Sequence, residues 1–235
     1  MKFKFLTVIL AVMLALASFT ACDIGLKDKA YEPTDIEYFE FSLRADGETY
    51  AISKKDGATL PESIKLPATF TAEDGTVYPV VEVKAEGFKG ENLLKSVTIP
   101  TGYTVIGMHA FISCESLETL VIGISQGRET SDGLVIGNGA FQNCSLNATV
   151  TLGSCIKVIE DYAFSGTKIS SILLNRVEKI GYMSFGECLS LSKFYIPATL
   201  VDIDGEAFKG SVNVKFSISS KNAKYKIEDN KIVEK

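Results

Sequence analysis

Cysteine side chains are the groups in this chain best suited to covalent or metal chemistry. Cys114, Cys144 and Cys188 each follow a phenylalanine by three residues, and no two cysteines have the C-x-x-C spacing of a metal or redox site. Two interpretations of Cys114 and Cys144 stay open: a disulfide, or free thiols that act as small core residues. The spacing favours free thiols, because side chains at equivalent positions of a stacked fold point in parallel directions.

The only histidine is His109, so a hydrolytic triad has a single candidate base. It precedes Phe111 by two residues, and nothing near it supplies a nucleophile or an orienting group. The same position before other phenylalanines is occupied by Glu86, Gly139, Tyr162, Met183 and Glu206. We therefore interpret His109 as a variable surface residue and predict no catalytic residue.

Two short motifs resemble ligand loops but are incomplete. Asp202-x-Asp204-Gly205-Glu206 begins like a calcium loop and lacks its bidentate final acid. Gly137-x-Gly139 lacks the third glycine of a dinucleotide loop, since Gln142 stands in that place. We predict no metal site and no cofactor, and we expect the protein not to be an enzyme.

A repeated module surrounds all of these residues. Six segments carry one phenylalanine in an equivalent place: Phe88, Phe111, Phe141, Phe164, Phe185 and Phe208. They are 23, 30, 23, 21 and 23 residues apart, with one insertion between Ile124 and Gly133. Alternating apolar residues follow each phenylalanine and predict a short strand with one buried face. Stacked modules would pair these strands in parallel and bury continuous ladders of side chains.

The modules resemble the BspA-like branch of bacterial leucine-rich-repeat proteins over residues 64–218. The residues of the second unit that carry the resemblance are Ile106, Gly107, Ala110, Phe111, Cys114, Leu117, Leu120 and Ile122. The resemblance implies a right-handed repeat solenoid with one parallel β-sheet and with short turns or 3-10 segments on the other face. It also implies a cell-surface protein that binds a ligand.

Hairpin signals stand at both ends of the repeats. Asp46-Gly47 and Asp74-Gly75 separate alternating runs near the front, and Asp229-Asn230 does so near the back. A stacked sheet needs its open edges covered, so we expect these hairpins to be caps. The expected domains are an N-terminal β cap with a first partial repeat (35–80), the leucine-rich repeats (81–218) and a C-terminal β-hairpin cap (219–235).

The first residues form a separate unit. Lys2 and Lys4 precede an apolar run from Leu6 to Phe19, which is shorter than the roughly 20 residues of a membrane-spanning helix. This pattern predicts a signal peptide over 1–21. Residues 19–22, Phe-Thr-Ala-Cys, resemble the lipobox of bacterial lipoproteins, which implies lipidation of Cys22 and a tether over 22–34. The membrane would then be reached through the lipid anchor only.

Charge narrows the choice of partners. The chain has 24 Lys+Arg against 29 Asp+Glu, which argues against the broad basic surface of a nucleic-acid-binding protein. The outer face of the predicted sheet is the best place for a contact surface. Its candidate ligand-binding residues are Leu173, Lys193, Tyr195 and Lys215, an apolar side chain and an aromatic ring beside two cations. An ordinary solvated sheet face is the competing interpretation.

Three functions remain open on the sequence alone. The favoured one is an exported, lipid-anchored, adhesin-like protein with a monomeric body, at the outer membrane or cell surface. Its partner would be a host or bacterial surface protein or a glycan. The second is a non-catalytic component that assembles or scaffolds the envelope, and the least favoured is a carbohydrate-processing enzyme.

Overall fold

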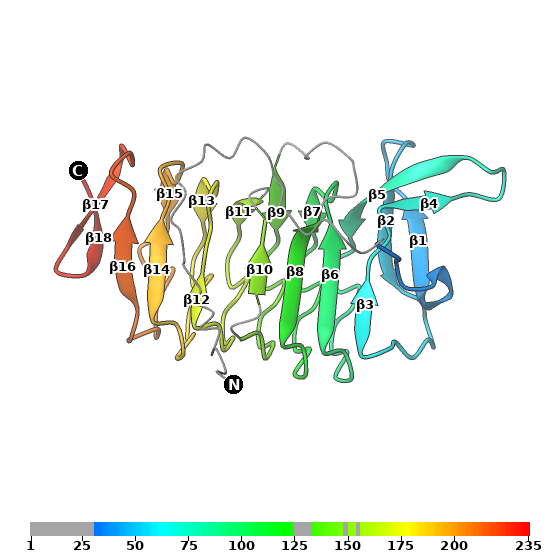
Figure 1. Ribbon diagram of the computed structural model, residues 1–235, viewed down its shortest axis with the longest axis horizontal. Helices are drawn as coiled ribbons and strands as arrows, with labels where there is room; N and C mark the ends of the chain where they lie inside the picture. The colour runs from blue at the N-terminus through cyan, green and yellow to red at the C-terminus, as the bar shows by residue number, and fades with distance from the viewer. Residues whose placement is uncertain (1–30, 125–132, 148–149, 154–155) are drawn as a thin grey trace, which may run out of the picture.

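The computed structural model describes residues 31–124, 133–147, 150–153 and 156–235. The predicted signal peptide, the lipidated Cys22, most of the tether, the insertion after Ile124, and Cys155 lie outside these residues. Within them, the repeats stack side by side along the long axis of the molecule, with the chain running from one end to the other (Figure 1).

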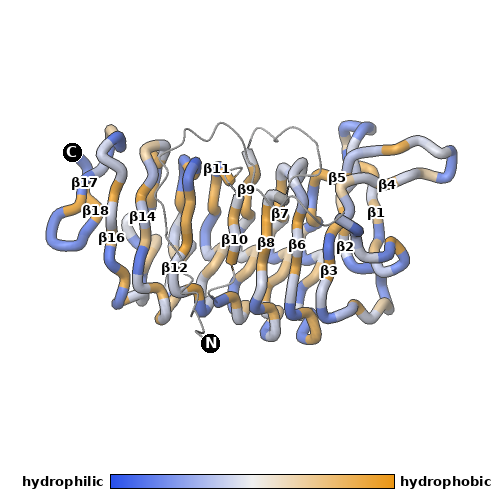
Figure 2. Tube along the Cα trace, in the orientation of Figure 1, coloured by the Kyte–Doolittle hydropathy of each residue, from blue (hydrophilic) through white to orange (hydrophobic). Residues whose placement is uncertain are grey.

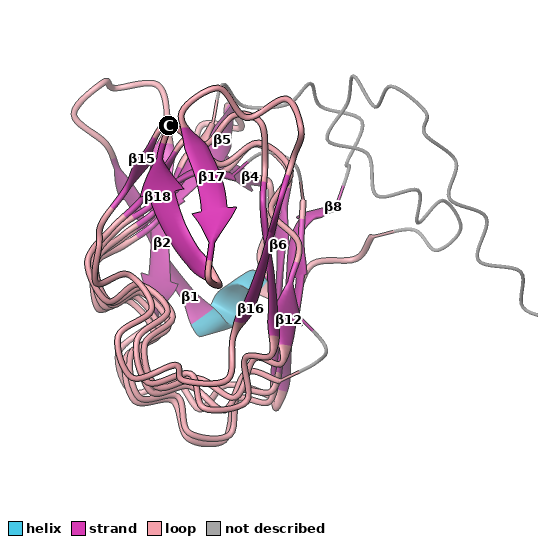
Figure 3. Ribbon diagram, turned by 90° about the vertical axis from the view of Figure 1, so that its left-hand side faces the viewer, coloured by secondary structure: helices cyan, strands magenta, loops and turns pink. Residues whose placement is uncertain are grey.

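Two walls of parallel strands face each other across the core, as the view along the stack shows (Figure 3). The first wall consists of β5 (Val77–Val83), β7 (Val105–Ile106), β9 (Leu134–Ile136), β11 (Ile156–Ile159), β13 (Lys179–Ile180) and β15 (Asp202–Ile203). The second wall has two sheets. One contains β3 (Ser63–Lys65), β6 (Ser96–Pro100), β8 (Thr119–Ile124) and β10 (Val150–Leu152); the other contains β12 (Ser171–Ile172), β14 (Lys193–Ile196) and β16 (Lys215–Ile218).

The first wall corrects the expectation of a single sheet with only turns or 3-10 segments opposite it. Each module contributes a second strand that ends five residues before its phenylalanine, and these strands pair in parallel register, as Val105 with Val135 and Ile106 with Ile136. Burial of the isoleucine explains the strand, because Ile106 and Ile136 are fully buried while the preceding valines are half-buried. The one 3-10 helix among the described residues, η1 (Ile36–Tyr38), lies before the repeats.

A glycine follows each of these isoleucines because the preceding turn leaves no room for a side chain. A Cβ at Gly107 would lie 2.5 Å from the backbone nitrogen of Ala85, and one at Gly137 would lie 2.7 Å from the carbonyl oxygen of Ile106. Real Cβ atoms do not approach backbone this closely, so the Ile-Gly pair of the repeat reflects close packing of one unit on the next.

The six repeat phenylalanines form a stacked ladder through the core. Ring centroids of successive members are 5.0, 5.2, 5.4, 5.5 and 5.5 Å apart, with interplanar angles of 11° or less. The buried residues of all units join in one hydrophobic core, and apolar and polar residues alternate along the strands (Figure 2). This alternation turns the apolar side chains of the strands toward the core and leaves polar side chains on the outer faces of the walls.

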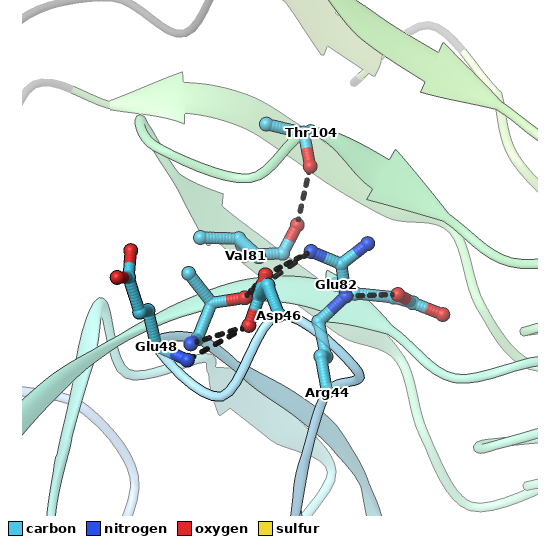
Figure 4. Close-up of polar contacts among 7 residues, drawn as sticks. Arg44, Asp46, Glu48, Val81, Glu82 and Thr104 are labelled. Atoms are coloured by element: carbon cyan, nitrogen blue, oxygen red, sulfur yellow. Dashed lines mark hydrogen bonds and ion pairs between the residues drawn. The ribbon is translucent and has the colours of Figure 1, made fainter.

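Two antiparallel hairpins form at the N-terminal end. In one, β1 (Phe39–Leu43) pairs with β2 (Tyr50–Lys54), and β2 then joins β5 in parallel. In the other, β4 (Thr69–Thr71) pairs with the first half of β5. The turn of the first hairpin is fixed to the wall, because Arg44 Nε donates to Glu82 Oε2 at 2.7 Å and Asp46 Oδ1 accepts two backbone N–H groups (Figure 4).

A third hairpin ends the chain, where β17 (Tyr225–Glu228) pairs with β18 (Lys231–Glu234). Asp229 and Asn230 form its two-residue turn, and both have φ near +50°, as a type I′ turn requires. Buried Asn222 ties the hairpin to the last repeat. Its Nδ2 donates to the carbonyls of Pro197 and Leu200, and its Oδ1 accepts the N–H groups of Lys224 and Tyr225.

Candidate ligand-binding face

The structure brings the predicted contact residues onto one exposed face of β12, β14 and β16. Lys193 of β14 is directly opposite Lys215 of β16, and Tyr195 is opposite Ser217. Leu173 directly follows β12, which pairs with β14 through Ser171 and Lys193. We call Leu173, Lys193, Tyr195 and Lys215 the C-terminal face patch. All four are exposed, Leu173 to 59% and Tyr195 to 36%.

The two lysines of this patch have no ion-pair partner among the described residues. Like charges directly opposite one another on neighbouring strands destabilise a sheet. In the first wall, by contrast, a lysine is opposite an acidic residue: Lys179 is opposite Asp202 on the next strand, and their charged atoms are 3.4 Å apart. The patch is therefore an uncompensated cationic site on an acidic protein.

Other residues on the outer face of the second wall differ in exposure along the wall. Ser96, Thr98, Thr119 and Val121 are half-buried, whereas Thr151 and Ser171 are exposed. Thr149 lies outside the described residues. The more open part of the second wall is thus its C-terminal half, where the patch lies.

Cys114, Cys144 and Cys188 are free and buried, so the disulfide alternative for Cys114 and Cys144 is excluded. Each thiol donates a hydrogen bond to the phenylalanine carbonyl of the preceding unit, at 3.0 to 3.2 Å. Burial raises the pKa of Cys188, and the hydrogen bond with Cys114 together with burial holds the pKa of Cys144 far above its usual range. Cys144 and Cys188 therefore stay protonated thiols that complete the turns, whereas the hydrogen bond with Cys144 lowers the pKa of Cys114.

His109 and the acidic motif at residues 202–206 have local structural roles. His109 adopts φ of +55° in its turn, as do Glu86 (+55°), Tyr162 (+57°) and Met183 (+45°) at the same position, and its Nδ1 lies 3.9 Å from Glu86 Oε1. Asp204 Oδ1 accepts the N–H of Glu206 at 2.8 Å. Within the described residues, no group of three metal-binding side chains occurs and no helix is long and apolar enough to cross a membrane.

Sequence reasoning missed a pocket at the C-terminal end of the stack. It has a volume of about 580 Å³ and lies between the last repeat and the C-terminal hairpin, lined in part by Phe208, Phe216, Ile203 and Ile232. A signal for it exists in the sequence. Phe208 is the last repeat phenylalanine, so the outer side of its ring has no following unit to cover it.

Residues 128–231 match the family model described as BspA type Leucine rich repeat region, in six copies. The repeats within this range are therefore similar to the BspA type. The matched range begins after the units of Phe88 and Phe111, but those units continue the same phenylalanine ladder and the same parallel walls. The repeat fold therefore continues toward the N-terminus beyond the matched residues.

Solved structures with a similar fold are bacterial proteins. The T. pallidum leucine-rich-repeat protein TpLRR is 22% identical with a TM-score of 0.52, over 80% of this chain and 71% of that one. A leucine-rich-repeat protein from Bacteroides ovatus is 21% identical with a TM-score of 0.56, over 82% and 53%. The pneumococcal vaccine antigen PcpA is 16% identical with a TM-score of 0.54, over 88% and 55%.

These likenesses establish the leucine-rich-repeat fold. The chain spans only about half the length of the B. ovatus protein and of PcpA. The search of curated proteins found no match.

Proposed function

We propose that this BspA-type chain is an exported, lipid-anchored surface protein that binds a protein or glycan ligand through the C-terminal face patch. The in-register pair of exposed lysines, Lys193 and Lys215, carries this proposal. Their mutual repulsion lowers the stability of the free protein, and an anionic ligand group that contacts both would remove that cost.

The neighbouring side chains suit a contact surface. Tyr195 offers a rigid ring that buries much area at little entropic cost, and Leu173 adds an apolar side chain on the adjacent strand. The strands beneath hold these groups at fixed spacing, because their inward-facing partners Phe194 and Ile196 are buried in the core. The ligand would therefore meet a preorganised surface.

Binding of the full-length chain to an array of extracellular-matrix proteins and glycans tests the proposal. The patch variant carries Lys193→Ala, Tyr195→Ala and Lys215→Ala. A matched control removes two lysines and one tyrosine elsewhere, by Lys157→Ala, Lys179→Ala and Tyr182→Ala. We expect saturable binding that the control retains and the patch variant weakens at least tenfold.

The proposal fails if the patch variant is folded and binds as tightly as the control. Binding to no member of the array would instead support the second function considered above, assembly or scaffolding within the envelope.

Export and lipidation need their own experiment, because the residues concerned lie outside the described structure. Cells expressing the chain are fed an alkyne analogue of palmitate, and incorporated label is detected on the purified protein. The wild-type chain should carry label and Cys22→Ser should carry none. Equal labelling of both would contradict the lipid anchor.

A further inference from the structure

The turn of the last unit, residues 204–211, has backbone donors without acceptors. Phe208 N and Gly210 N have no hydrogen-bond acceptor among the described residues. In all five earlier units, the equivalent N–H groups donate to carbonyls of the next turn: Phe185 N to Ala207 O and Glu187 N to Lys209 O are the last such pair. Two backbone amides that donate hydrogen bonds in each of the five earlier units therefore have no acceptor in the last unit.

The phenylalanine ladder ends at the same place. Phe208 stacks on Phe185 at 5.5 Å, and on its other side lies the pocket of about 580 Å³. The five earlier ladder phenylalanines are at most 1% exposed, whereas Phe208 and neighbouring Phe216 are only half-buried. The pocket is thus lined by aromatic surface and by Phe208, which carries one of the two free donors, and Gly210 directly follows the lining residue Lys209.

The opposite end of the repeats has no such gap. There the ring of Phe39 packs edge-on against Phe88 at 6.1 Å, and the carbonyl of Gly87 accepts the N–H of Lys54 at 2.9 Å. The first turn is therefore covered at its ring and at one of its backbone carbonyls.

The C-terminal hairpin covers the last strands but leaves the turn open. Asn230 accepts the N–H of Phe216 and donates to the carbonyl of Val214, so it replaces a neighbouring strand along β16. Lys224 Nζ donates to the carbonyl of Val201 beside β15. The hairpin crosses the end of the stack between the two walls (Figure 3), and the pocket lies between it and the last turn.

We propose that this pocket binds a polypeptide segment of a partner protein, with an aromatic side chain against Phe208 and two carbonyls on Phe208 N and Gly210 N. The five internal interfaces define the occupant: each covers a ring with a ring and fills the two donors with carbonyls two residues apart. When a peptide segment is added to the end of the stack in this way, its main-chain hydrogen bonds provide affinity and the pocket selects its side chain. The site is separate from the C-terminal face patch.

The probe is a blocked peptide of sequence DGEAFKGSV, which copies residues 204–212, the turn that covers Phe185. It is titrated into the ¹⁵N-labelled full-length chain, and amide shifts are recorded by NMR. We expect saturable shifts of the Phe208 and Gly210 amides. A second peptide with alanine in place of phenylalanine should bind at least tenfold more weakly.

Two variants locate the site. Gly205→Tyr should abolish peptide binding by filling the pocket, because a Cβ at Gly205 meets no atom within 4 Å and the fold can accept it. Glu40→Tyr places the same side chain on exposed β1 at the far end and should bind as the wild type does. The C-terminal face patch variant should also retain peptide binding, so failure of the proposed function and failure of this inference are distinguishable.

Three results would overturn the inference. The first is no saturable shift of the Phe208 and Gly210 amides with either peptide. The second is equal affinity for both peptides. The third is self-association in sedimentation experiments that Gly205→Tyr removes, which would show that a second copy of the chain occupies the pocket.

Discussion

The hydroxyl of Ser211 donates a hydrogen bond to the carbonyl oxygen of Phe185 at 2.7 Å and accepts the N–H of Cys188 at 2.9 Å. Thiols make the first of these bonds at the same position of other units. A hydroxyl and a thiol are thus interchangeable donors here, and in these four units the donor connects the turn to the one before it.

Ser211→Ala should lower the free energy of unfolding by about 1–3 kcal/mol, because it leaves a buried carbonyl and a buried N–H unsatisfied. Ser211→Cys should retain most of the stability, since cysteine occupies this position in three units. Chemical denaturation measures both. Ser217→Ala, an exposed serine on the next strand, is the control, and a loss as large as that of Ser211→Ala would contradict the explanation.

Ser184→Ala should stabilise the protein. Its hydroxyl is fully buried without a hydrogen-bond partner, and the equivalent residues Ala110, Ala140, Ala163 and Ala207 are buried alanines. An unsatisfied buried hydroxyl costs about 1–3 kcal/mol, and each 1 kcal/mol shifts Tm by about 2–4 °C in a chain of this size. The reciprocal change Ala163→Ser should lower Tm, and a lower Tm for Ser184→Ala would refute the prediction.

Asn222→Ala should weaken the attachment of the C-terminal hairpin. The change removes four hydrogen bonds, two donated by Nδ2 and two accepted by Oδ1, at a residue that is 1% exposed, and we expect a loss of at least about 2 kcal/mol. Amide hydrogen exchange over residues 225–234 should also become faster. Asn213→Ala removes one exposed hydrogen bond and should change neither measurement. Unchanged exchange in Asn222→Ala would show that other contacts hold the hairpin.

The three buried thiols should resist alkylation at pH 8 in the folded protein and react after denaturation. Burial raises the pKa of Cys188, which keeps it as the unreactive neutral thiol at this pH. Mass spectrometry of tryptic peptides distinguishes Cys114, Cys144 and Cys188 from the cysteines elsewhere in the chain. Rapid modification of any of the three without unfolding would contradict their placement.

The same shifts predict lower stability at alkaline pH. Burial also raises the pKa of Tyr103, so this phenol and the thiols of Cys144 and Cys188 hold their protons in the folded state after the unfolded chain has lost them. The unfolded state then binds fewer protons, and the free energy of unfolding falls as pH rises above about 8.5. Denaturation at pH 8 and pH 10 checks the direction, and equal stability at both would contradict it.

Sequence periodicity predicted the second wall and the three hairpins because both signals are local. Alternation marks Lys193–Ile196 and Lys215–Ile218, and a spacing of 22 residues between Lys193 and Lys215 aligns the patch. The first wall escaped prediction because two-residue strands such as β7 and β13 are too short to alternate. Among the described residues, Lys193 and Lys215 have no carboxylate partner. This depends on the positions of side chains, which a sequence pattern does not specify.

The direction of the hydrogen bonds between turns has a consequence for unfolding. Each turn donates alternate backbone N–H groups to the next turn, so the turn of an inner unit is held on both sides, while the last turn is held on one and only the strands of its unit meet the C-terminal hairpin. Loss of the final unit would transfer the free amides to the unit before it and expose Phe185 as Phe208 is exposed now. Such a chain frays one repeat at a time from its C-terminal end, with each step recreating the same frayed surface.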